Sequence, residues 1–130
     1  MAEVYVRRVY ETAAAEGADP AGSNDGLRVL VDRLWPRGLA RDNARIDHWL
    51  RGVAPSDDLR RWFGHDPERW QEFQARYHAE LRASAHPDLA LLRRLAAEQG
   101  RVTLLFAARD ENHNNATALK AFLDTLQGAV

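Results

Sequence analysis

The sequence contains no cysteine and only one lysine, Lys120. The absence of cysteine excludes a disulfide framework, a thiol nucleophile, an iron–sulfur cluster and a zinc site built from cysteine ligands. A charge bias is also absent, because 18 basic side chains stand against 19 acidic ones. A dedicated nucleic-acid-binding domain usually carries a strong basic excess, so this composition argues against a nucleic-acid partner.

Long apolar runs are absent as well. No run reaches about 18 apolar residues, so we expect no membrane-spanning helix. The first residues lack the basic start and apolar stretch of a signal peptide, and we therefore expect a cytoplasmic protein. What remains is an ordinary globular composition, 45% hydrophobic and 28% charged over 130 residues. This length fits a single domain over residues 1–130 with one core.

Arginine supplies 17 of the 18 basic residues. One explanation is a GC-rich genome, whose codons favour arginine and alanine. The other is selection for guanidinium groups, which recognise anions through a forked set of donors. Only local clustering of the arginines can separate the two explanations.

Hydrophobic patterning predicts three strands. Residues 4–10 are β-branched and aromatic, and residues 27–32 form a short apolar run after a glycine. Residues 102–108 are apolar on both faces, so we expect that strand to be central. Glycine, proline, asparagine and aspartate between 11 and 26 indicate a loop.

Five helices are expected from the same patterning. The first covers 46–53, where Ile46, Trp49, Leu50 and Val53 recur at helical spacing after Asp42 or Asn43 as cap. The others begin at typical capping positions and cover 56–64, 66–83, 86–100 and 114–126. Apolar strands separated by helices predict parallel pairing through a right-handed crossover. We therefore expect an α/β fold with a small, mostly parallel sheet of about three strands and helices packed against it.

Ligands of open α/β sheets bind beyond the carboxyl ends of the strands. The first polar segment at such an end holds Asp32, Arg33, Trp35 and Arg37. There Arg33 and Arg37, joined by Arg8, would surround an anion, and Trp35 would form a stacking wall. The alternative is structural, with Asp32 paired to Arg33 or Arg37 and Trp35 filling the core.

A second polar segment follows the last strand and holds Arg109, Asp110, His113, Asn114 and Asn115. Amides at the start of the last helix, together with Arg109, would bind an anion. His113 is the candidate acid or base, with Asp110 or Glu111 to orient it and Asp32 as a further catalytic carboxylate. The alternative is helix capping by Asp110 or Asn114 with His113 solvated. No pair of histidines has helical ligand spacing, so we expect no metal site and no cofactor.

The run from Val29 to Gly38, which contains Asp32-Arg33-Leu34-Trp35-Pro36-Arg37-Gly38, resembles the signature of the YeaO-like family of unknown function. Arg8-Val9-Tyr10, Ala54-Pro55-Ser56 and Thr103-Leu104-Leu105 are similar to that family too. The resemblance covers nearly the whole chain and implies a small α/β domain. A wider group of related domains carries a Cys-His pair near the turn before the last helix. This chain has His113-Asn114-Asn115 there, so thiol chemistry does not carry over.

Three functions remain open, and whether the protein is an enzyme stays undecided among them. The first is binding of, or catalysis on, a small anionic ligand at the carboxyl edge of the sheet. The second is a non-catalytic protein-interaction module, since arginine and tryptophan also dominate protein interfaces. The third is a nucleic-acid-associated regulator, a label that some relatives carry; it requires a one-sided arrangement of the arginines. The sequence does not indicate an oligomeric state.

Overall fold

The structure, a computed structural model, describes residues 3–10, 26–40 and 45–128. Its centre is a parallel sheet of four strands in the order β1-β4-β2-β3. The strands are β1 (Glu3–Arg8), β2 (Leu27–Leu30), β3 (His48–Trp49) and β4 (Arg101–Phe106). The central position of β4 and the parallel pairing are confirmed, with Val4 opposite Val102 on one side and Leu30 opposite Leu105 on the other. The sheet has four strands rather than about three.

The fourth strand lies where we expected a helix over 46–53, and that prediction was wrong. His48 and Trp49 pair with β2, and the amide of Leu50 donates to the carbonyl of Leu30 at 2.9 Å. A 3-10 turn, η1 (Arg51–Val53), follows. The edge of β2 offers backbone groups that need partners, and extended chain satisfies them. The expected caps, Asp42 and Asn43, lie outside the described residues.

The apolar spacing in 46–53 gave a wrong prediction because the apolar residues of this segment are buried on opposite faces of the sheet. Leu50 and Val53 belong to the main core, which lies between the sheet and the helices. Ile46 and Trp49 instead pack on a second core cluster formed by Val9, Leu30 and Leu105. A strand followed by a turn therefore reproduces a spacing that is typical of one helical face.

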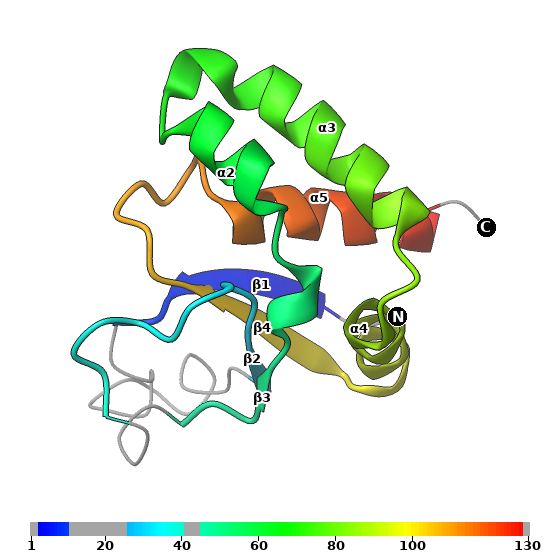
Figure 1. The fold of residues 1–130 in the computed structure, drawn as a ribbon. Helices are drawn as coiled ribbons and strands as arrows, with labels where there is room; N and C mark the ends of the chain where they lie inside the picture. The colour runs from blue at the N-terminus through cyan, green and yellow to red at the C-terminus, as the bar shows by residue number, and fades with distance from the viewer. Residues whose placement is uncertain (1–2, 11–25, 41–44, 129–130) are drawn as a thin grey trace.

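The helices cover one face of the sheet (Figure 1). They are α2 (Asp57–Phe63), α3 (Trp70–Ala83), preceded by the 3-10 turn η2 (Pro67–Arg69), α4 (Pro87–Glu98) and α5 (Asn115–Gly128). The predicted starts at Ser56, Asp66 and His86 are confirmed, since each accepts a hydrogen bond from a backbone amide of the first turn. The helix predicted over 66–83 is divided into η2, which Asp66 caps, and α3. None of the described helices is long and apolar enough to cross a membrane.

The alternation along the strands explains the two-sided core. Val29 and Val31 face the helices, as do Leu104 and Phe106, whereas Leu30 and Leu105 face the other side. Successive side chains of a strand point to opposite faces, so a strand that is apolar throughout must be covered on both. All four strands run in one direction. The loop after β2 and the loop before α5 therefore meet at the same edge of the sheet (Figure 1).

Candidate functional site

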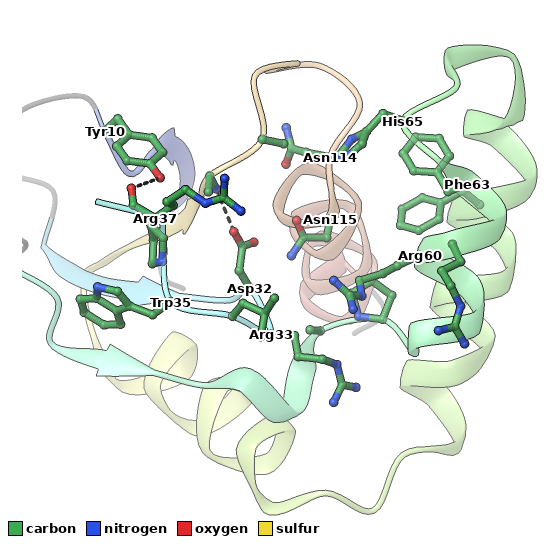
Figure 2. Close-up of a pocket in the computed structure, with 18 residues that line it drawn as sticks. Tyr10, Asp32, Arg33, Trp35, Arg37, Arg60, Phe63, His65, Asn114 and Asn115 are labelled. Carbon is green, nitrogen blue, oxygen red and sulfur yellow. Dashed lines mark hydrogen bonds between the residues drawn. The ribbon is translucent and has the colours of Figure 1, made fainter. Parts of the chain in front are cut away.

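A cavity of about 790 Å³, here called the edge pocket, lies at the carboxyl edge of the sheet (Figure 2). Its lining comes from the end of β1, the loop after β2, the loop after β4 and helix α2. From the predicted site residues it takes Asp32, Arg33, Trp35, Arg37, Asn114 and Asn115. The two polar segments therefore meet as the strand directions predict.

Asp32 ties three elements together at the floor of the edge pocket. Its Oδ2 accepts a hydrogen bond of 2.9 Å from the amide of Ala107 at the end of β4. Its backbone carbonyl accepts another, of 2.8 Å, from the indole of Trp49. Burial raises the pKa of Asp32, against the lowering effects of the Ala107 amide, the Asn115 side chain and the charge of Arg60. Asp32 therefore fixes the ends of the strands that surround the pocket, and its Oδ2 already accepts a hydrogen bond from the protein.

Arg33 does not pair with Asp32. Its Nε lies 3.2 Å from Oδ1 of Asp57 in the first turn of α2, and Figure 2 shows the guanidinium pointing away from Asp32. The same Asp57 oxygen accepts a hydrogen bond of 2.7 Å from Arg60, which helps to hold the pKa of Asp57 below its usual value. Arg33 thus lines the pocket mainly as a link to α2.

Arg37 has no carboxylate partner within ion-pair distance among the described residues. Its exposed side chain extends towards Asp32 without reaching it, while its backbone carbonyl accepts a hydrogen bond of 2.8 Å from Tyr10 (Figure 2). Arg60 approaches from α2 on the other side of the pocket. The guanidinium that is available to a ligand at this end is therefore Arg37, with Arg60 opposite it.

Trp35 serves both as wall and as packing. Its indole N–H donates to the carbonyl of Leu39 at 2.7 Å, and its ring meets Trp49 edge to face at 5.4 Å between centroids. Both rings pack on the second core cluster. The structure thus supports the core-filling interpretation of Trp35 while leaving the residue in the lining of the pocket.

The loop before α5 is organised by Asp110. Its Oδ1 accepts hydrogen bonds from the amides of Asn112 and His113, and its Oδ2 lies 2.9 Å from Nδ1 of His113. The bond from the Asn112 amide, followed by that from the His113 ring, lowers the pKa of Asp110. The ring of His113 meets Trp70 edge to face at 5.3 Å, and His113 is not part of the pocket lining. Asp110 therefore organises the loop rather than capping α5, and His113 is paired and packed rather than solvated.

Asn114 and Asn115 play structural parts at the start of α5. The side-chain oxygen of Asn114 accepts a hydrogen bond from the amide of Thr117 at 2.8 Å, and its amide group donates to the carbonyl of Asp110. Asn115 donates to the carbonyl of Val31 at 3.1 Å. Asn114 is therefore the helix cap, and Asn115 attaches α5 to the loop after β2.

Arg8 and Arg109 lie in a second cavity, of about 690 Å³, here called the adjoining hollow. Asp110 is also part of its lining, whereas His113 is not. The Nε of Arg8 donates to the carbonyl of Ala108 at 3.1 Å, and the guanidinium lies 4.8 Å from the centre of the Tyr10 ring. The structure therefore separates Arg8 from Arg33, with which the sequence had grouped it.

The described residues contain no group of three or more histidine, aspartate or glutamate side chains placed to hold a metal ion. Asp110 and His113, which with Glu111 lie in the loop before α5, pair with each other. The site is therefore described by guanidinium groups, amides and aromatic rings.

Comparison with known proteins decides the family. The model described as the inactive DUF488-N3 subclade matches residues 3–128. This chain belongs to the DUF488 family. It is 44% identical over 121 residues to a protein of Mycobacterium tuberculosis and to one of Mycobacterium bovis, with 93% of each chain covered. It is 37% identical over 108 residues to YeaO of Escherichia coli, covering 83% of this chain and 92% of YeaO. All three relatives are described as uncharacterized, and no solved structure matches.

Sequence reasoning missed several residues that line the pocket of this DUF488 domain, above all Tyr10, Arg60 and His65. The sequence could have predicted Tyr10 as a lining residue, because Tyr10 follows β1 and parallel strands end at the same edge of a sheet. Arg60 and His65 carry no sequence signal, since α2 is brought over the pocket by tertiary packing. His65 follows Gly64 with a φ of 58°, a left-handed conformation that is uncommon outside glycine.

Proposed function

We propose that this DUF488 domain binds a small anionic ligand in the edge pocket and does not transform it. The clustering of arginine carries this proposal. Six arginines and two aspartates line the edge pocket and the adjoining hollow, in a chain whose net charge is -1. Three of the six are paired with Asp57 or Asp58, and the other three, Arg8, Arg37 and Arg109, have no carboxylate within ion-pair distance among the described residues. A genome-wide codon bias would spread arginine over the surface, whereas anion recognition gathers it at one place.

The absence of a reaction is inferred from the proton carriers that the sequence predicted. His113 is paired with Asp110 and packed on Trp70, away from the pocket lining. One oxygen of Asp32 accepts from the Ala107 amide. The matching family model is described as inactive, which supports binding without catalysis.

Arg37→Gln tests the proposal. In a thermal-shift titration with inorganic phosphate, sulfate and citrate, at least one anion should stabilise the natural protein; a ligand at a hundred times its Kd adds about 2.7 kcal/mol. Loss of a charged hydrogen-bonding group costs about 1.5–3 kcal/mol, so Arg37→Gln should weaken that anion about tenfold or more. The control is Arg93→Gln, because Arg93 is an exposed arginine on α4, away from both cavities.

Two results contradict the proposal: no anion stabilises the protein, or Arg37→Gln and Arg93→Gln bind the anion as the natural protein does. One observation favours the alternative function, a non-catalytic protein-interaction module. The apolar side chain of Leu34 is 68% exposed in the lining of the pocket. If no small anion binds, size-exclusion chromatography of the natural protein and of Leu34→Ser tests self-association through this apolar residue. Binding to a single-stranded oligonucleotide at two salt concentrations tests nucleic-acid binding.

A further inference from the structure

We propose that the ligand carries two anionic groups joined by a short spacer, one held in the edge pocket and the other in the adjoining hollow. Arg37 and Arg60 would hold the first group, and Arg8 and Arg109 the second. This inference rests on the proposed function and names the class of ligand for it. Dicarboxylates and bisphosphonates share the required chemistry.

The two cavities lie side by side. Tyr10, Arg37, His65, Ala107 and Ala108 line both of them. Arg37 therefore borders both cavities. A ligand that filled only the edge pocket would leave the arginines of the adjoining hollow unused.

Arg8 is already oriented for an anion. Its Nε is bound to the carbonyl of Ala108, and its guanidinium lies over the ring of Tyr10. The two terminal nitrogens have no partner among the described residues. A guanidinium that is fixed at Nε and on one face loses little freedom when it binds a carboxylate or phosphonate through its terminal nitrogens.

The one acid in the described lining of the adjoining hollow offsets only part of the charge of these arginines. Asp110 is the one carboxylate in the described lining, and it already accepts hydrogen bonds from two backbone amides and faces the ring of His113. Arg109 is exposed and has no carboxylate within ion-pair distance among the described residues. Arg8, Arg37 and Arg109 together therefore leave a positive excess that a second anionic group would balance.

Isothermal titration with two matched series tests this inference. The first compares propionate with malonate, succinate, glutarate and adipate; the second compares methylphosphonate with bisphosphonates of increasing spacer length. Linking two binding groups makes the second contact intramolecular, so the best dianion should bind at least tenfold tighter than the monoanion. Affinity should pass through a maximum with spacer length, because a short spacer fails to reach and a long one adds flexibility.

Arg109→Gln and Arg8→Gln should each remove most of that tenfold gain and leave monoanion affinity within twofold. Arg109→Gln is the more secure variant, because Arg8 also holds the carbonyl of Ala108. Arg93→Gln should change neither affinity. Equal binding of monoanions and dianions, or a dianion gain that survives Arg109→Gln, would overturn the inference and leave the proposed function intact. Absence of binding by both series, together with absence of stabilisation by phosphate, sulfate and citrate, would overturn both.

Discussion

Gly26→Ala is expected to lower the free energy of unfolding by about 2–5 kcal/mol, the sum of left-handed backbone strain and steric overlap. Gly26 precedes β2 with a φ of 65°. A Cβ atom there would lie 2.2 Å from the carbonyl oxygen of Arg101 and 2.8 Å from its Cβ. Arg101 begins β4, and β2 pairs with β4 from Leu27 onwards. The added methyl group would therefore force the two central strands apart at their start.

Two other glycines separate strain from overlap in this experiment. Gly38 has a φ of 77° but nothing within 4 Å of a Cβ, so Gly38→Ala should cost only the backbone strain, about 1–2 kcal/mol. Gly100 has neither feature, and Gly100→Ala should be close to neutral. Urea denaturation followed by circular dichroism measures all three. Similar losses for Gly26→Ala and Gly38→Ala would show that the approach of Arg101 does not matter.

Asp32→Ala is expected to destabilise the fold by about 1–3 kcal/mol relative to Asp32→Asn. The alanine leaves the amide of Ala107 without its acceptor at the end of the central strand, whereas asparagine keeps an oxygen in that place. Urea denaturation of the two variants at neutral pH measures the difference. Equal stability would mean that water replaces the carboxylate at no cost.

The natural protein and Asp32→Asn should also differ in their response to pH. Burial raises the pKa of Asp32 in the folded state, so ionisation costs more in the folded than in the unfolded protein. The natural protein should therefore lose stability relative to Asp32→Asn as pH rises from the ordinary aspartate pKa of about 3.9 through the raised folded value. Above that window the difference should be constant. A difference that is constant throughout, or that changes in the opposite direction, would contradict a raised pKa.

The arrangement of the site explains why these residues matter beyond stability. Asp32 joins the ends of β2 and β4, and Asn115 joins α5 to the same place. These contacts hold the loop that presents Arg37, whose carbonyl Tyr10 fixes from the end of β1. A rigid frame around a charged side chain lowers the entropy lost when a ligand binds.

The sequence alone determined the α/β class, most element positions and the edge of the sheet where the polar segments meet. These features depend on short-range signals, such as the apolar run in β4 and the caps at Ser56 and Asp66, or on strand direction, which follows from the helical crossover. The motif from Asp32 to Gly38 likewise indicated the family, which the match over residues 3–128 confirms.

The tertiary structure alone decided the fourth strand and the partners of the charged side chains. Residues 46–53 became β3 and a turn because β2 had a free edge, which no spacing within that segment records. Arg33 lies against Asp57 of α2, because long side chains take the nearest opposite charge in space. Arg60 reaches the pocket because tertiary packing brings α2 over it. The sequence offered Asp110 or Glu111 as the partner of His113, and the structure selects Asp110. Coulomb interactions act over a few ångströms whatever the separation along the chain, so only the packed structure can assign these partners.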